Sequence, residues 1–296
     1  MTQQNPPTFL YIGISKAGST WIFEALREHP QIFVPHVKDI RYFEDEFYNP
    51  QAYDRYCQYF APAGSAQARG ELSHNYILSA TCAERIQYHL PHAKLLVCLR
   101  EPGDWVTSTY RYMRMFRPEA QAGFEHFWAH VLRERGVLNY YENLKAYYER
   151  FDSSQINVMF YEDLRADASR FAADLYRFLA VDPAFQPRVI DQHVNAARSS
   201  RFGNRVTQLL NVISQTLRRM GLANVVGTLK HNALMNKLFF SSTTPAIDIA
   251  PATVQAIRTA TAHQYTQLET LIGRDLPAVW YDHLADRAGE GQAHAS

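Results

Sequence analysis

A lysine, a glycine and two hydroxyl residues stand together near the start of the chain, in Ser15-Lys16-Ala17-Gly18-Ser19-Thr20-Trp21. An apolar run from Phe9 to Ile14 precedes them, and a helix-compatible run from Trp21 to Leu26 follows. A strand that turns through Lys-x-Gly into a helix forms an anion site, because the first helical turn offers N–H groups without partners and the helix dipole favours negative charge. The spacing therefore predicts a loop that binds phosphate or sulfate.

The order of residues in this loop differs from the common nucleoside-triphosphate loop. The Walker A pattern G-x-x-x-x-G-K-[ST] needs a lysine directly after its second glycine. Gly13 and Gly18 are suitably spaced, but Ser19 follows Gly18 and Lys16 precedes it. The loop is therefore not a Walker A loop, and its residue order indicates an anionic ligand other than a nucleoside triphosphate.

A second group of residues with anion-binding chemistry lies further along the chain. The apolar run from Lys94 to Leu99 ends in Arg100, and Pro102 then opens a helical pattern that carries Ser108. An arginine at the end of a strand can hold a phosphate through two parallel hydrogen bonds, and a serine on the next helix can donate another. This pair predicts a second phosphate contact.

Both groups resemble the nucleotide motifs of sulfotransferases that use 3′-phosphoadenosine-5′-phosphosulfate (PAPS). The first loop is similar to the family's Pro-Lys-[Ser/Thr]-Gly-[Ser/Thr]-[Ser/Thr], with Ser15 in place of the proline and Ala17 in place of a hydroxyl residue. The resemblance implies that PAPS is the donor and 3′,5′-adenosine bisphosphate (PAP) the product. It assigns the 5′-phosphate to Lys16, Ala17, Gly18, Ser19, Thr20 and Trp21, and the 3′-phosphate to Arg100 and Ser108.

Further similarity to this family extends over residues 9–280. Tyr161-Glu-Asp-Leu164 looks like the family's YEDL segment, and Leu268 to Trp280 looks like its terminal helix and closing turn. His193 to Arg201 stands where many members have an asparagine and basic residues beside the 3′-phosphate. This position implies cofactor contacts for Arg198 and Arg201.

The acceptor side offers two candidates for the general base. Lys38-Asp39-Ile-Arg-Tyr-Phe43 resembles the Lys-Glu-[apolar]-x-Phe-Phe segment of heparan-type and bacterial carbohydrate sulfotransferases, in which the carboxylate is the base. Asp39 aligns with that carboxylate but is one methylene shorter. His74 is the second candidate, because a histidine is the base in the cytosolic sulfotransferases. The resemblance thus gives Lys16, Asp39 and His74 as catalytic residues, and Glu71 is expected to be structural.

The elements that must position these residues alternate between short apolar runs and helical patterns. This alternation indicates an α/β fold, and the resemblance makes it a P-loop-like three-layer fold with a central, mostly parallel sheet and a helical C-terminal lobe. We expect one domain over residues 1–286, a helical substrate lobe or lid over about 200–245, and a disordered tail over 287–296. The expected strands and helices are Phe9–Ile14, Ser19–Glu28, Gln31–Val34, Arg69–Leu72, Ala80–His89, Lys94–Leu99, Asp104–Met115, Phe124–Arg135, Leu138–Phe151, Ile156–Tyr161, Ser169–Leu179 and Pro251–Ile272.

Composition narrows the classes of partner. The chain has 296 residues and a net charge of +1, so no bulk charge favours nucleic acid or an anionic membrane. Its three cysteines have no metal-ligand spacing, and we expect no metal. No signal peptide or apolar run of about 18 residues is evident, which predicts a cytoplasmic enzyme without a transmembrane segment.

The predicted function is transfer of a sulfuryl group from PAPS to an acceptor hydroxyl, on a carbohydrate or a glycolipid. Leu72 replaces a lysine that helps heparan enzymes to hold anionic saccharides, which argues against a highly sulfated glycan. A P-loop kinase and a non-catalytic nucleotide-binding module are the alternatives. The residues do not choose between Asp39 and His74 as the base, and they do not specify the oligomeric state.

Overall fold

The computed structural model of this chain describes residues 5–114, 118–129, 136–191, 199–200, 240–241 and 249–282. Its centre is a five-stranded sheet in the order β2-β3-β1-β4-β5, in which every neighbouring pair is parallel. The expected α/β class with a central parallel sheet is confirmed. The strands are β1 (Phe9–Gly13), β2 (Ile32–Phe33), β3 (Ala68–Leu72), β4 (Lys94–Leu99) and β5 (Ile156–Phe160).

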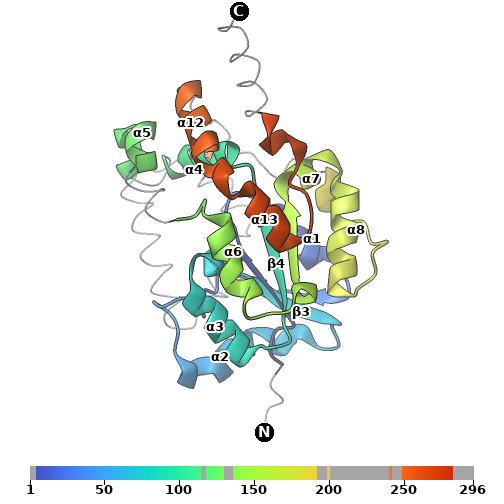
Figure 1. The fold of residues 1–296 in the computed structure, drawn as a ribbon. Helices are drawn as coiled ribbons and strands as arrows, with labels where there is room; N and C mark the ends of the chain where they lie inside the picture. The colour runs from blue at the N-terminus through green and yellow to red at the C-terminus, as the bar shows by residue number, and fades with distance from the viewer. Residues whose placement is uncertain are drawn as a thin grey trace, which may run out of the picture.

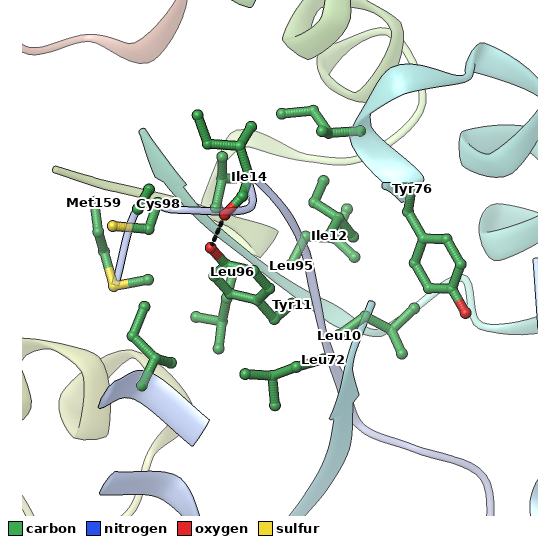
Figure 2. Packing of buried hydrophobic residues seen from close by; sticks show 14 of the residues in the cluster. Leu10, Tyr11, Ile12, Ile14, Leu72, Tyr76, Leu95, Leu96, Cys98 and Met159 are labelled. Atoms are coloured by element: carbon green, nitrogen blue, oxygen red, sulfur yellow. Dashed lines mark hydrogen bonds between the residues drawn. The ribbon is translucent and has the colours of Figure 1, made fainter. Parts of the chain in front are cut away.

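The central strand β1 is buried on both faces along its whole length. This is why its sequence is continuously apolar and does not alternate, as parallel strands covered by helices on both sides require. Figure 2 shows the side chains of Leu10, Tyr11 and Ile12 among those of the neighbouring strands. The core therefore lies directly beneath the loop that follows β1.

Helices cover the sheet on both sides. Figure 1 shows α3, α6 and α13 on one side and α1 and α8 on the other. The helices are α1 (Ser19–Glu28), α2 (Tyr53–Cys57), α3 (Ala80–His89), α4 (Pro102–Met113), α5 (Phe124–Phe127), α6 (Tyr140–Tyr148), α7 (Tyr161–Ala166), α8 (Ala168–Leu179), α12 (Pro251–Thr261) and α13 (Tyr265–Ile272).

Helix α4 begins two residues before its expected start at Asp104. The carboxylate of Glu101 accepts hydrogen bonds from the backbone N–H groups of Gly103 and Asp104, at 2.9 and 2.8 Å. These bonds cap the helix in the way that acidic N-cap residues do, and Pro102 fits the first helical position. The cap fixes the direction in which the chain leaves Arg100.

The helix expected over Pro251–Ile272 is wrong in one respect, because it is two helices with a 3-10 turn at Ala262–Gln264 between them. The buried side chain of Gln264 donates to the carbonyl of Leu138 at 2.8 Å and accepts from the N–H of Tyr141 at 3.0 Å. These tertiary bonds hold the turn against the start of α6. The helical periodicity of the sequence does not reveal these two hydrogen bonds.

The strand order reverses direction at β1, so a ligand crevice is expected at the carboxyl ends of β1 and β4. From β1 the chain passes through α1 to β2 and β3 on one side of β1, and then through α3 to β4 on the other side. In open α/β sheets, ligands bind where the connections diverge in this way. The loop after β1 and Arg100 after β4 both lie at this edge.

Some expectations fall outside the described residues. These are most of the helical lobe over about 200–245 and the tail over 287–296. Within the lobe region, β6 (Ser199–Ser200) pairs antiparallel with β7 (Phe240–Ser241).

Candidate active site

The loop between β1 and α1 is held by side chains from the core. The hydroxyl of Tyr11 donates to the carbonyl of Ile14 at 2.8 Å (Figure 2). The indole N–H of Trp105, from α4, donates to the carbonyl of Ser15 at 2.7 Å. Two buried side chains thus fix the path of the loop before any ligand binds.

Gly18 forms the junction of this loop and α1. Its φ of +82° lies in the left-handed region, and a Cβ there would stand 2.8 Å from Leu164 Cδ2 and 3.3 Å from Tyr161 Cδ2. The first helical hydrogen bond runs from the N–H of Ile22 to the carbonyl of Gly18, at 3.0 Å. The N–H groups of Ser19–Trp21 therefore have no partner within the helix, as the anion site expected here would require.

Three cationic side chains surround this helix end. Lys16 Nζ lies 4.2 Å from the ring centroid of Tyr112, and Lys38 Nζ donates to Ser19 Oγ at 3.3 Å. Burial, and then the charges of Arg100 and Lys38, lower the pKa of Lys16 from 10.5 to about 8. Burial is the larger cause of this lowered pKa and repulsion by the other two cations adds to it, so an anion placed among them would favour the charged lysine.

Arg100 lies between the loop after β1 and helix α4. Its Nη1 donates to the carbonyl of Lys16 at 3.2 Å, and its guanidinium carbon lies 4.4 Å from the ring centroid of Tyr161. Its Nη2 is 3.7 Å from a carboxylate oxygen of Asp104. Among the described residues its buried Nε has no hydrogen-bond partner. Buried donors are nearly always satisfied, so this atom fits a site that takes an acceptor from a ligand.

Ser108 lies on the face of α4 that is turned toward these cations. Asp104, one turn before it, reaches Arg100, and Tyr112, one turn after it, covers Lys16. Residues four apart share a helix face. The half-buried Ser108 is therefore on the same side of α4 as both cationic groups.

The two candidate bases form a pair. His74 Nδ1 lies 2.5 Å from Asp39 Oδ1, and the N–H of Asp39 donates to the carbonyl of Leu72 at 2.8 Å. A Cβ on Gly13 would stand 3.1 Å from the carbonyl oxygen of His74, so the pair adjoins the end of β1. The strand order thus places this pair on one side of the Lys16 loop and Arg100 on the other.

Glu71 supports the segment that carries Asp39. Its buried carboxylate accepts hydrogen bonds from Ser73 Oγ, Tyr76 OH and Tyr56 OH, at 2.7, 2.7 and 3.2 Å. Ser73 Oγ in turn accepts from the N–H of Arg41 at 2.9 Å. Burial raises the pKa of Glu71 to about 7 despite these bonds. All its contacts are internal, as a structural role requires.

The remaining expected residues differ in what they can contribute. The side chain of Trp21 is buried and its indole N–H donates to the carbonyl of Val189 at 3.1 Å, so only its backbone can reach a ligand. Ala17 is fully buried and is limited to its backbone in the same way. Arg198 and Arg201 lie outside the described residues.

Two further side chains, Lys38 and Tyr112, lie at the site although the sequence patterns do not predict a role for them. Lys38 contacts the hydroxyls of Ser19 and Thr20, at 3.3 and 3.5 Å. Its position directly before Asp39 is the signal that could have indicated it. Tyr112 could have been found from its spacing of one helical turn after Ser108.

No group of histidine, cysteine, aspartate or glutamate side chains in the described part of the chain could hold a metal ion. None of its helices combines the length and hydropathy that a membrane span needs.

A cationic loop and an arginine at the crevice of a parallel sheet define a protein that binds an anionic nucleotide or a similar ligand. The family model described as "Sulfotransferase domain" matches residues 6–216. This is more than half of the chain, and the chain belongs to the sulfotransferase family.

Individual relatives are similar to parts of this chain. Membrane-associated sulfotransferase kil1 of Dictyostelium discoideum is 30% identical over 126 residues, which are 40% of this chain and 27% of that protein. Bifunctional heparan sulfate N-deacetylase/N-sulfotransferase 4 of Mus musculus is 26% identical over 199 residues, which are 60% of this chain and 23% of that protein. The chain spans about a quarter of the length of these relatives.

A solved structure shares the fold. The sulfotransferase from Alicyclobacillus acidocaldarius superimposes with a TM-score of 0.65 and 21% identity, over 93% of this chain and 99% of that chain. The sheet and its flanking helices are therefore those of a known sulfotransferase.

Proposed function

We propose that this protein transfers a sulfuryl group from PAPS to the hydroxyl group of an acceptor. The observation that carries the proposal is the arrangement of two anion sites around one crevice, with a potential base beside them. Lys16 and the start of α1 form one site, and Arg100 with Ser108 forms the other. A nucleotide with phosphates on both its 5′ and 3′ positions presents two anions of this kind.

The donor-binding residues fit PAPS in charge and in hydrogen-bonding capacity. A phosphate group would relieve the mutual repulsion of Lys16, Lys38 and Arg100. The N–H of Arg100 Nε could donate a hydrogen bond to it. The N–H groups of Ser19–Trp21 would hold the 5′-phosphate, while Arg100 and Ser108 would hold the 3′-phosphate. PAPS supplies the activated sulfuryl group.

By analogy with phosphoryl transfer, this chemistry needs alignment and charge stabilisation more than covalent work by the protein. Lys16 would stabilise the charge that develops on the oxygen between sulfur and the 5′-phosphate. The pair Asp39–His74 would take the proton of the acceptor hydroxyl. Such a base is typically worth about 10²–10⁴-fold in rate.

We propose a carbohydrate or a glycolipid as the acceptor. The support is the similarity to Lys-Glu-[apolar]-x-Phe-Phe around Asp39 and the relation to a mouse protein named as a heparan sulfate N-sulfotransferase. Leu72 is buried in β3, where it adds no charge to the acceptor side. A neutral or weakly anionic sugar is therefore the better candidate.

We further propose that the enzyme works in the cytoplasm. All three cysteines, Cys57, Cys82 and Cys98, are buried free thiols, which suits a reducing compartment. One relative is named as membrane-associated. Fractionation of cells that express the full chain, followed by detection in the soluble and membrane fractions, tests this proposal.

The function is tested first by the donor and then by the acceptor. PAP at a thousand times its Kd should stabilise the protein by about 4 kcal/mol in thermal unfolding. A screen of sugars and glycolipids with radiolabelled PAPS should then give a labelled product, and Lys16→Ala should abolish transfer in a folded protein. Wild-type turnover by that variant would contradict the role of Lys16. PAP binding without any transfer would favour a non-catalytic module, and turnover of ATP that depends on Mg²⁺ would favour a kinase.

A further inference from the structure

Lys38 brings a positive charge from the segment after β2 to the start of α1. Its Nζ lies 3.3 Å from Ser19 Oγ and 3.5 Å from Thr20 Oγ1, which belong to the first turn of that helix. It is also 5.8 Å from the ring centroid of Phe23, one turn further along. The ammonium therefore lies beside the same helix end that is expected to hold an anion.

The backbone on both sides of Lys38 is anchored. The side chain of Val37, before it, is buried in the core. The N–H of Asp39, after it, donates to the carbonyl of Leu72 at 2.8 Å, and Asp39 has a left-handed φ of +59°. Lys38 itself is half-buried, and its ammonium sits on a flexible four-carbon stem. The chain thus brings the ammonium to one place, while the side chain can adjust to a bound ligand.

The contacts of Lys38 with the two hydroxyls suit a site that takes an anion. Distances of 3.3 and 3.5 Å are long for hydrogen bonds from nitrogen to oxygen, and a hydroxyl oxygen carries no negative charge to offset the ammonium. The charge of Lys38 is also close enough to Lys16 to lower the pKa of that lysine. A hydroxyl that accepts from Lys38 still has its own O–H to donate. An anion bound here would therefore receive hydrogen bonds from Ser19 and Thr20 and attract both lysines.

We propose that Lys38 binds the sulfate end of PAPS, while Lys16 and the start of α1 bind its 5′-phosphate. This proposal rests on the proposed sulfuryl transfer and assigns a residue to the group that is transferred. In PAPS the sulfate is attached to the 5′-phosphate and has to face the acceptor. Lys38 directly precedes Asp39, which contacts His74 on the acceptor side. Of the three cations at this site, Lys38 is the one that shares a segment with a candidate base.

Lys38 orients the transferred group without exchanging a proton. Its ammonium donates to the sulfate oxygens, so that sulfur faces the acceptor hydroxyl in line with the bond that breaks. The acceptor oxygen bonds to sulfur, and its proton goes to the base at the Asp39–His74 pair. The electron pair of the broken bond stays on the 5′-phosphate beside Lys16. The ammonium of Lys38 has the same protons before and after the transfer.

Comparing PAPS with PAP separates a sulfate contact from a phosphate contact, because PAP carries its whole 5′ charge on one phosphate and PAPS divides it between a phosphate and a sulfate. Titration calorimetry without acceptor gives both dissociation constants. Lys38→Met should weaken PAPS binding by about 10- to 100-fold, as the loss of a hydrogen bond to a charged group implies. It should weaken PAP binding by no more than about fivefold, which is the effect of an ion pair across solvent. Lys38→Arg keeps the charge and should bind PAPS more tightly than Lys38→Met.

Lys145→Met is the matched control, since Lys145 is also half-buried, lies 5.9 Å from a tyrosine ring centroid and belongs to α6. It should leave both affinities unchanged. If Lys38→Met does not fold, Lys38→Gln, which keeps an N–H donor toward Ser19, gives the same comparison. The assignment of Lys38 is wrong if the variant weakens PAP and PAPS by the same factor, or weakens neither. Failure of the wild type to bind either nucleotide would instead overturn the proposed function.

Discussion

Replacing Lys16 by methionine should stabilise the protein in the absence of nucleotide. Burial and the charges of Arg100 and Lys38 lower the pKa of Lys16 from 10.5 to about 8. At 1.36 kcal/mol per pH unit, this difference corresponds to an unfavourable term of about 3 kcal/mol for the charged lysine. The variant also loses the contact of the ammonium with Tyr112, worth about 0.5–1 kcal/mol. The expected net gain in the free energy of unfolding is about 2 kcal/mol at pH 7.

How the free energy of unfolding changes with pH follows from the direction in which folding shifts the pKa of Lys16. Because the pKa of Lys16 is lower in the folded than in the unfolded protein, the unfolded chain binds one more proton between pH 8 and 10.5. The stability of the wild type therefore rises with pH across this window, relative to the variant. Urea unfolding at pH 7 and at pH 10 should show the advantage of Lys16→Met shrinking to less than about 1 kcal/mol at the higher pH.

Nucleotide should reverse the order of stability. With PAP at a thousand times its Kd, the wild type should gain about 4 kcal/mol, while Lys16→Met, which lacks the phosphate contact, should gain much less. Lys145→Met is the control, since Lys145 also lies near a tyrosine ring, 5.9 Å from the centroid of Tyr141, and belongs to α6, which carries none of the proposed PAP ligands. If Lys16→Met is less stable than the wild type at pH 7 without nucleotide, burial and the neighbouring cations do not destabilise the charged lysine as argued here.

Three other variants test residues that hold the loop after β1 and the starts of α1 and α4 in place. Gly18→Ala should lose about 1–2 kcal/mol of stability from left-handed strain and also weaken PAP binding, measured by thermal shift, because the start of α1 must move. Arg258→Met should cost about 3 kcal/mol in urea unfolding, since Arg258 makes bonds of 3.0 and 3.1 Å to the nearly buried Glu101. Trp105→Phe removes the bond to the Ser15 carbonyl and should cost about 1 kcal/mol in stability and lower the affinity for PAP in titration calorimetry.

Matched controls separate these effects from general damage. Gly273→Ala has the same left-handed strain in open space, so it should cost stability without affecting PAP binding. Arg177→Met breaks an exposed ion pair with Asp174 and should change stability by less than about 0.5 kcal/mol. Equal effects of Gly18→Ala and Gly273→Ala on PAP affinity would contradict the role given to the start of α1.

Local patterns in the sequence are enough to predict the elements that carry the proposed donor-binding residues. Ser19–Glu28 has the predicted bounds, and Arg100 follows β4 as expected, because strand, turn and helix signals there are short-range and agree with one another. The same signals cannot specify which strands are neighbours. The adjacency of β1, β3 and β4 brings Lys16, His74 and Arg100 to one edge of the sheet.

Contacts between distant segments account for what the sequence leaves open. The pairing of Asp39 with His74 depends on a left-handed residue and on bonds to β3 that no spacing reveals. The approach of Lys38 to Ser19 depends on the path of the loop after β2. The break between α12 and α13 likewise follows from two hydrogen bonds of Gln264. One joins it to Tyr141 in α6, and the other to Leu138, which precedes α6. These are tertiary contacts, which override local propensity.

The central claim is that the crevice holds a nucleotide with a 3′-phosphate at Arg100, and titration calorimetry at pH 7 tests it most directly. PAP should bind about 10- to 100-fold more tightly than 5′-AMP, as hydrogen bonds to a charged group of about 1.5–3 kcal/mol imply. Arg100→Met should remove most of that difference while still binding 5′-AMP. Equal affinity of the wild type for PAP and 5′-AMP, or tighter binding of ATP with Mg²⁺ than of PAP, would contradict the account.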